Sequence, residues 1–520
     1  MKSIRRIIHG SGLRVVNLGA TVAVGLFLMP FLVHHLGDTV YGYWALVGSI
    51  LGYYGILDFG IVSAVQFYVA KALGENDGEG ANRTISVSFF LFAAIGAVIL
   101  FVTVLSSLLV HRFVTDPEQA AMLRDVLLIM GAGFAVGFPG RAFLGALSAH
   151  LRWDLLSIIG LAGLSARTAL IVVAIEAHGG LVAMASVMVV TDVITFTVYY
   201  LVLRRIHRPV RLSAAYINFR TLKQILTYSS FSLVVKVSYQ LRFYIDIWVI
   251  GAFLSVGIVT HYAIGSRLAL SFMDLMICLI GLLHPWFSIL LGSKDYDGIR
   301  RILKFGTKVS ASAAAIVAML LIVYGRLFIH AWMGGSYGDA YWPLVLLVSG
   351  VFFEVSQQPS TSFLFGVSLN RFLALISFLE AIANVALSLY WVHVYGMIGV
   401  ALGTAVPSLI VRLFIQPAYV CRKSGIAIGE YYAQLLGRAS FAGIIGVLGP
   451  WLLLFQWISW PNLFAIIPLV AGQAVIATAV VYFLAFDAGE RGQINDALLS
   501  ALRVNDAVAV TGKTELGQLT

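Results

Sequence analysis

Residues 84–110 read TISVSFFLFAAIGAVILFVTVLSSLLV, a stretch without a single charged side chain. A bilayer core about 30 Å thick is crossed by roughly 20 apolar residues in a helix. Strands of a membrane barrel would be shorter and would alternate apolar with polar residues, which this stretch does not do. The stretch therefore predicts a transmembrane helix.

Similar runs occur along the whole chain, so the sequence predicts an all-α membrane protein with about fourteen transmembrane helices. The composition agrees, because 60% of the 520 residues are hydrophobic and only 11% are charged, with a mean hydropathy of +0.93. Soluble proteins carry roughly 25% charged residues. The predicted spans are 13–33, 42–70, 84–110, 124–147, 153–175, 180–203, 224–251, 257–291, 307–330, 342–366, 372–392, 396–420, 437–457 and 462–486.

Several classes of protein are excluded by the same sequence. The net charge of +10 does not indicate nucleic-acid binding, since the basic residues are scattered through short loops. The two cysteines, Cys278 and Cys421, form neither a disulfide scaffold nor a metal-ligand cluster. Asp58-Phe59-Gly60 resembles a kinase signature, but it falls inside a predicted membrane helix without the companion motifs. We expect no metal, no cofactor and no nucleotide-binding loop.

The Lys and Arg residues predict the orientation. With the N-terminus inside, 24 of the 34 fall in predicted cytoplasmic segments, eight lie within spans, and only Arg112 and Arg124 lie in outer loops. Cytoplasmic loops of membrane proteins carry an excess of Lys and Arg. We therefore expect both termini to be cytoplasmic.

The chain also resembles itself at an offset of about 214 to 220 residues. Six helices separate the copies, and this even number predicts a parallel repeat of two bundles with a substrate path between them. The matching segments are Pro139–Gly145 with Pro359–Gly366, Gly180–Ala185 with Gly396–Ala401, and Asp77-Gly78 with Asp297-Gly298, the last pair preceding Arg83 and Arg300.

The repeat predicts two pseudo-symmetric six-helix bundles, 1–203 and 224–420. A basic cytoplasmic linker, 204–223, joins them and carries six positive charges. The linker either fixes the topology only or also lies against anionic lipid headgroups. Two extra transmembrane helices, 421–486, and a cytoplasmic tail, 487–520, follow the second bundle.

Ionisable side chains at membrane depth are the candidate functional residues, because each costs about 2.5–3.5 kcal/mol at a helix centre unless it faces a partner or water. In the seventh span, several polar side chains share an arc of roughly 160°. This arc holds Ser229, Ser232, Lys236, Tyr239, Gln240, Arg242 and Asp246. The first span adds Arg14 and Asn17, and the eighth adds Arg267 and Asp274.

Other ionisable groups within spans are Asp58, Arg141, Arg167, Asp192, Arg326, Glu354, Glu380 and Arg412. Structural alternatives remain open for several of these groups. Arg14 lies near a span end and can extend its guanidinium to the interface. Arg242 and Asp246 are spaced i, i+4 and can neutralise each other. Asp58, Asp246 and Asp274 are either ion-coupling groups or structural carboxylates.

The N-terminal third resembles the Wzx-type polysaccharide-unit flippases of the multidrug/oligosaccharidyl-lipid/polysaccharide exporter superfamily. The resemblance rests on Leu36-Gly37-x4-Gly42-Tyr43-Trp44-Ala45-Leu46, on the segment Gly52–Gly60, and on the short polar loop from Lys71 to Arg83. The fourteen-helix plan extends it over the whole chain. The resemblance implies two bundles that open alternately to either side of a bacterial inner membrane, with the first, second, seventh and eighth helices around a central cavity.

The resemblance also implies a substrate: an undecaprenyl-pyrophosphate-linked oligosaccharide, carried from the cytoplasmic to the outer face for polysaccharide biosynthesis. The polysaccharide polymerase and chain-length machinery would be partners, beside membrane lipid. A cavity with Arg14, Lys236, Arg242 and Arg267 would hold the pyrophosphate, and Asn17, Tyr239 and Gln240 would hold the sugars.

Three alternatives are a drug or cation antiporter of the same superfamily, a flippase for the peptidoglycan precursor, and a polysaccharide polymerase or ligase. The last is an enzyme, and the short outer loops argue against it. We therefore expect no enzyme activity.

Overall fold

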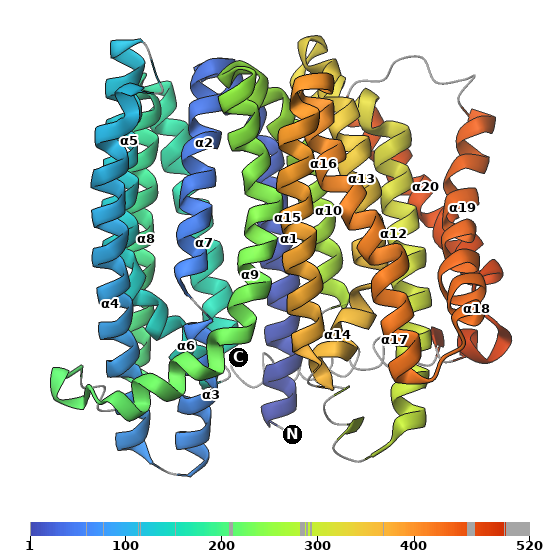
Figure 1. Ribbon diagram of the computed structural model, residues 1–520, viewed down its shortest axis with the longest axis horizontal. Coiled ribbons are helices and arrows are strands. Elements are labelled where there is room, and N and C mark those ends of the chain that lie inside the picture. The colour runs from blue at the N-terminus through green and yellow to red at the C-terminus, as the bar shows by residue number, and fades with distance from the viewer. Residues whose placement is uncertain are drawn as a thin grey trace, which may run out of the picture. The chain divides into compact units, whose positions relative to one another are not determined.

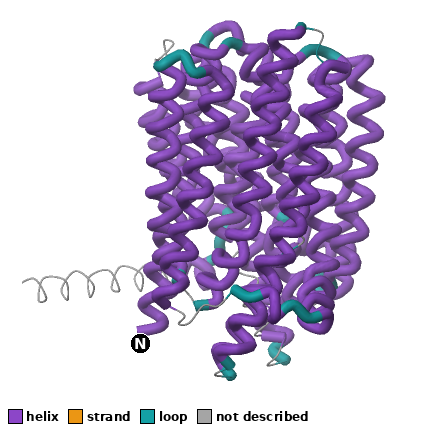
Figure 2. Tube along the Cα trace, turned by 90° about the vertical axis from the view of Figure 1, so that its left-hand side faces the viewer, coloured by secondary structure: helices purple, strands orange, loops and turns teal. Residues whose placement is uncertain are grey.

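The computed structural model describes residues 2–58, 60–75, 77–112, 114, 116–150, 152–206, 212–280, 287, 290–291, 294–367, 369–454, 463–492 and 494–495. These residues form helices and contain no strand, as Figure 2 shows by colour. The first part of the chain (Figure 1) comprises α1 (Lys2–Leu36), α2 (Asp38–Tyr54), η1 (Gly55–Asp58), α3 (Ile61–Gly74), α4 (Gly78–Leu109), η2 (Val110–Arg112), α5 (Pro117–Gly137), η3 (Phe138–Gly140), α6 (Arg141–Ala149), α7 (Trp153–Glu176), α8 (Gly180–Ile206), η4 (Ala214–Tyr216), α9 (Phe219–Phe253) and α10 (Val256–Ile280).

The second part contains two π-helical segments, η6 and η7, among its α-helices. Its elements are α12 (Tyr296–Met333), η5 (Gly335–Ala340), α13 (Tyr341–Ser356), α14 (Gln358–Gly366), α15 (Asn370–Tyr395), α16 (Met397–Ile410), η6 (Val411–Ile415), α17 (Gln416–Ser424), α18 (Ile428–Glu430), η7 (Tyr431–Gly437), α19 (Arg438–Leu454) and α20 (Leu463–Leu484).

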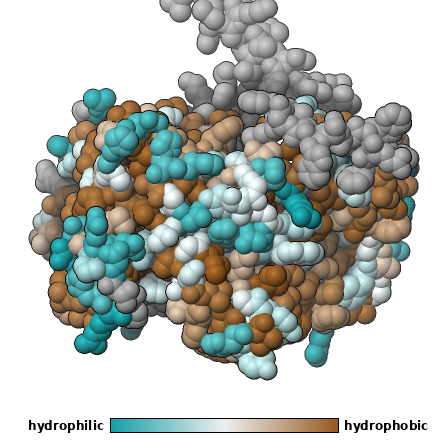
Figure 3. Space-filling view, turned by 90° about the horizontal axis from the view of Figure 1, so that it is seen from above, coloured by the Kyte–Doolittle hydropathy of each residue, from teal (hydrophilic) through white to brown (hydrophobic). Residues whose placement is uncertain are grey.

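The prediction of an all-α membrane protein is confirmed. In the described part of the chain, 11 helices are long and apolar enough to cross a membrane, and each overlaps one of the predicted spans. Two predicted spans, 124–147 and 342–366, are each divided into two α-helices, α5 with α6 and α13 with α14. The other three predicted spans, 42–70, 224–251 and 257–291, correspond to α2 with α3, to α9 and to α10. Because α10 ends at Ile280, most of the remainder of the last span lies outside the described residues. Exposed side chains on α4, such as Phe101 and Leu108, are apolar, as expected of a surface that faces lipid. In the view onto one end in Figure 3, hydrophilic residues are mixed with hydrophobic ones.

The span 42–70 is not the continuous helix that the sequence predicts. The short 3₁₀ segment η1 ends α2, and Gly60 then adopts a left-handed conformation with φ 73° before α3 begins. Glycine has no Cβ and enters this conformation without strain. Asp58 is buried at the break, where its Oδ1 accepts from the Val62 amide at 3.4 Å. The segment around Asp58 and Gly60 is therefore a helix break and not part of one membrane helix.

The chain forms two compact units. Unit 1 comprises Met1–Cys278, Gly335–Gly350 and Leu369–Val411, and unit 2 comprises Leu279–Gly334, Val351–Ser368 and Arg412–Thr520. In unit 1, α4 packs along α5, α5 along α8, α8 along α7 and α7 along α1, while α15 packs against both α9 and α16. In unit 2, α12, α19 and α20 pack against one another. The division into bundles 1–203 and 224–420, a linker, two extra helices and a tail stays a prediction.

Two local structures recur at the offset of the predicted repeat. Asp77 caps α4 by accepting from the Gly80 amide at 2.8 Å, and Asp295 caps α12 by accepting from the Gly298 amide at 2.8 Å. The structural counterpart of Asp77 is therefore Asp295 and not Asp297, the residue that the sequence match pairs with it. Gly180 and Gly396, which precede matching helices, have φ values of 60° and 59°.

Candidate functional site

Arg242 on α9 forms a buried ion pair with Glu380 on α15. Only 4% of the Arg242 side chain and 1% of the Glu380 side chain are exposed. The guanidinium carbon also lies 4.4 Å from the centre of the Phe243 ring. A charge at membrane depth needs such a partner, since insertion alone costs several kcal/mol. The partner comes from another helix, and Asp246, one turn further along α9, forms other contacts.

Asp246 lies at the centre of a buried polar cluster formed by four helices. Its Oδ2 accepts from the Tyr262 hydroxyl of α10 at 2.5 Å and from the Thr404 hydroxyl of α16 at 2.6 Å. The Asn384 amide of α15 donates to the same Thr404 hydroxyl at 2.6 Å. Within the described ranges, the Oδ1 atoms of Asp246 and Asn384 have no hydrogen-bond partner. Two buried acceptors without donors can take up a proton, a water molecule or a small cation.

Arg267 extends from α10 toward α1 and α2. Its guanidinium covers Gly25 so closely that a Cβ there would lie 2.2 Å from Nη2. Its charge also acts on the Tyr41 hydroxyl of α2 and on the Asp274 carboxylate of α10. The side chain is only partly buried. A cation that remains partly accessible at membrane depth, where three helices meet, is suited to binding an anion.

The other predicted site residues are less closely connected. Asn17 of α1 is half-buried, with its amide beside Gly160 of α7, and Tyr239 packs its ring 4.9 Å from that of Phe243. Gln240 is half-buried and Asp274 is exposed. Arg14 and Lys236 lie in α1 and α9, but their side chains fall outside the described part of the structure. The assignment of these residues to a substrate cavity stays a prediction.

A second group of charges lies within unit 1. Arg167 of α7 pairs with Asp192 of α8 and donates from Nε to the Thr191 hydroxyl at 3.1 Å. Arg141, at the start of α6, interacts electrostatically with both Asp58 and Asp192. The sequence marks these four residues as intramembrane charges but does not group them, since they come from four different elements.

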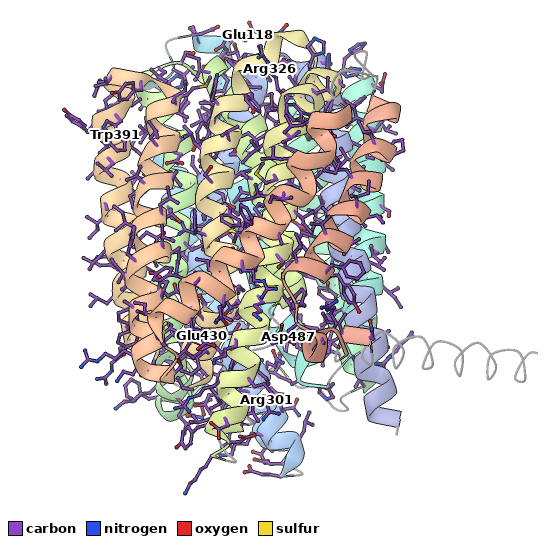
Figure 4. All side chains as sticks on the ribbon, turned by 90° about the vertical axis from the view of Figure 1, so that its right-hand side faces the viewer. Glu118, Arg301, Arg326, Trp391, Glu430 and Asp487 are labelled. Carbon is purple, nitrogen blue, oxygen red and sulfur yellow. The ribbon has the colours of Figure 1, made fainter. Side chains whose placement is uncertain are left out.

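In unit 2, basic side chains pair with carboxylates. Arg412 lies 3.8 Å from Glu354, and Lys304 lies 2.6 Å from Glu430. Lys308, largely buried, lies 2.8 Å from Glu490. Figure 4 shows Arg301, Glu430 and Asp487 toward one end of this unit and Arg326 toward the other. The pairs of Lys304 and Lys308 connect α12 to segments near the C-terminus, and the pair of Arg412 connects η6 to α13, so we assign all three a structural role.

Sequence reasoning missed the partners of the site. From the sequence, Glu380 is identified only as an acidic residue within a span, and Tyr262, Asn384 and Thr404 are not identified as site residues. Glu380 is 138 residues from Arg242, and Thr404 is 158 residues from Asp246. No local spacing connects residues that far apart. A polar residue inside an apolar span was the available signal, but it does not identify the partner.

A helical membrane protein with paired charges at membrane depth has features found in secondary transporters. Residues 19–173 match the family named MatE. The chain is 22% identical over 465 residues to the uncharacterized membrane protein EpsK of Bacillus subtilis (strain 168), covering 86% of this chain and 89% of EpsK. It is 19% identical over 417 residues to a Shigella flexneri protein provisionally named O-antigen transporter, covering 79% of this chain and 97% of the relative.

Solved structures share the fold. The lipid II flippase MurJ in an inward closed conformation aligns with a TM-score of 0.69 at 15% identity, over 92% of this chain and 98% of that chain. An outward-facing multidrug resistance transporter of the MATE family aligns with a TM-score of 0.63 at 14% identity, over 81% and 96%. Residues 19–173 thus match the MatE family, and the chain shares its fold with these solved transporters. The chain is a multi-pass helical membrane protein, and its MatE match together with the name of the Shigella relative points to a transporter rather than to an enzyme.

Proposed function

We propose that this transporter is a flippase for undecaprenyl-pyrophosphate-linked oligosaccharide repeat units. It moves them by alternating access from the cytoplasmic to the outer face of a bacterial inner membrane, with both termini cytoplasmic. The products then reach a polysaccharide polymerase and its chain-length machinery. The observation that carries the proposal is Arg267, a partly accessible guanidinium at membrane depth beside α1 and α2. The provisional name of the Shigella relative supports the same substrate class.

The chemistry of such a substrate explains the need for cations. A pyrophosphate–sugar head loses its water in hydrocarbon and needs replacement partners. Arg267 can bind phosphate oxygens through two donors at once, and Arg14 and Lys236 belong to the same predicted set. Asn17, Tyr239 and Gln240 supply donors, acceptors and a ring for sugars. Arg242 would join this set only if its pair with Glu380 opened.

We assign ion coupling, rather than a purely structural role, to Asp246. Its carboxylate is buried, and its Oδ1 has no donor among the described residues. A proton or a small cation bound at Asp246 would remove the cost of this buried, unpaired acceptor. The membrane potential can also drive transport of the substrate, since outward movement of its negatively charged headgroup is favoured by about 2.3 kcal/mol per charge per 100 mV.

Deletion of the gene tests the substrate class. We expect lipid-linked repeat units to accumulate on the cytoplasmic side, and complementation with Arg267→Ala and Lys236→Ala to fail at normal protein levels. Full rescue by both variants would refute the cavity assignment. Asp246→Asn should bind substrate but lose the dependence of transport on an imposed ion gradient.

The drug antiporter alternative is tested by the same strain. A flippase mutant accumulates lipid-linked saccharide and keeps its resistance to cationic drugs, whereas an antiporter mutant shows the reverse.

A further inference from the structure

The short segment between α8 and the rising part of α9 lies across the end of unit 1. Figure 1 shows the first turns of α9 running across this end before the helix turns along the others. Contacts hold the segment against α3 and α4. The Tyr68 hydroxyl of α3 donates to the Gln224 carbonyl at 3.4 Å, and the Ser213 amide donates to the Ser86 hydroxyl of α4 at 3.4 Å. The segment thus lies at the level where membrane helices end.

Large apolar side chains of this segment point outward. Phe219 is 78% exposed, and Ile217 and Leu226 are also exposed, while Ile225 is fully buried against the unit. At 100° per residue, Phe219, Lys223 and Leu226 fall within an arc of roughly 60°. A helix at the membrane boundary that presents apolar side chains around a lysine matches the pattern of an interfacial amphipathic helix.

Three cations in and next to this segment have no carboxylate partner among the described residues. Arg204 and Arg205 end α8, and both are exposed, as is Lys223. No carboxylate described in the structure lies within ion-pair distance of these three groups. Other basic residues at the same end are neutralised: Lys71 lies 3.9 Å from Glu75, and Arg83 lies 3.3 Å from Glu79. Positive charge without a carboxylate partner therefore lies on the same helix arc as Phe219, at Lys223, and at the end of α8 that leads into the segment, at Arg204 and Arg205.

We propose that this surface, here called the linker face, binds the headgroups of anionic phospholipids in the leaflet at the end where α1 begins. The linker face consists of Arg204, Arg205, Ile217, Phe219, Lys223 and Leu226. Apolar side chains of such helices enter the boundary between headgroups and acyl chains, and the cations bind phosphate. A zwitterionic surface lacks the net negative charge that these three cations complement. This inference is independent of the substrate.

Spin labelling of the full-length protein tests the position of the linker face. The label replaces Phe219 (Phe219→Cys) in a background in which Cys278 and Cys421 are changed to serine, and the protein is reconstituted in vesicles. In vesicles of phosphatidylglycerol and phosphatidylcholine, we expect the label to be accessible to oxygen and protected from a water-soluble nickel reagent. A label at Gln224, roughly 140° around the helix, is the matched control and should be accessible to nickel.

The contribution of charge is measured as affinity for fluorescent phosphatidylglycerol. Each neutralised cation should weaken binding about five-fold, so Lys223→Gln gives about five-fold and the triple variant with Arg204→Gln and Arg205→Gln about a hundred-fold. The control variant Lys71→Gln/Arg83→Gln removes paired charges and should change affinity less than two-fold. The proposal would be overturned if the triple variant and the control variant lost affinity for phosphatidylglycerol equally. It would also be overturned if the label at Phe219 were accessible to the nickel reagent in the vesicles that contain phosphatidylglycerol.

Discussion

Replacing Glu380 with glutamine should destabilise the protein far more than breaking a surface ion pair. The Arg242 guanidinium would stay buried without the carboxylate that it is paired with, and side-chain exposures of 4% and 1% leave almost no solvent to screen the charge. Two unit charges about 4 Å apart interact by about 4 kcal/mol at an effective dielectric of 20. Removing one member of a buried pair costs about 3–5 kcal/mol in measured cases, so we expect a loss of that size.

The double variant Arg242→Met/Glu380→Met removes both charges. Comparing it with Glu380→Gln therefore distinguishes the stability that the ion pair itself contributes from the cost of leaving one charge buried alone. Because burying two ions is itself costly, the double variant should lie within about 1 kcal/mol of the wild type, or be more stable. The assay is unfolding in mixed detergent–SDS micelles, followed by circular dichroism. The matched control is Glu79→Gln, which breaks an exposed pair with Arg83 and should cost less than about 1 kcal/mol.

Two outcomes would refute the reasoning. In one, Glu380→Gln costs no more than Glu79→Gln, which would mean that the Arg242 charge is solvated in the folded protein. In the other, the double variant loses as much unfolding free energy as the single variants Arg242→Met and Glu380→Met lose together, which would mean that the two side chains do not interact.

Three further predictions concern local structure. Gly60→Ala should cost about 1–2 kcal/mol in the same unfolding assay, since φ 73° strains a residue with a Cβ; an unchanged stability would contradict the helix break. Asp77→Ala and Asp295→Ala should each cost about 1 kcal/mol, because both side chains cap helices by the same contact; unequal losses would count against the structural repeat. Lys308→Met should increase proteolysis after α20, because it removes the pair with Glu490; an unchanged cleavage rate would argue against this contact.

The membrane class and most of the helices could be predicted from the sequence because their causes are local. Residues 84–110 have no charge to solvate, and all but the last of them form part of α4. The break at Gly60 could not be predicted from hydropathy, since its neighbours remain apolar and glycine occurs both inside and between membrane helices. The sequence match pairs Asp77 with Asp297, two residues beyond its structural counterpart Asp295. The cap is defined by a hydrogen bond, which a comparison of residue types does not reveal.

By itself, the sequence determined that lipid is the solvent of this protein and that charges at membrane depth must find partners. It also predicts one orientation of the helices from the positions of the Lys and Arg residues. Only the tertiary structure decided which partners the charges at membrane depth find. Local spacing favoured Asp246 for Arg242, yet packing of α9 against α15 supplies Glu380 and leaves Asp246 to Tyr262 and Thr404. The physical reason is that burial and neutralisation depend on distances between helices far apart in the chain, which no periodicity along one helix contains.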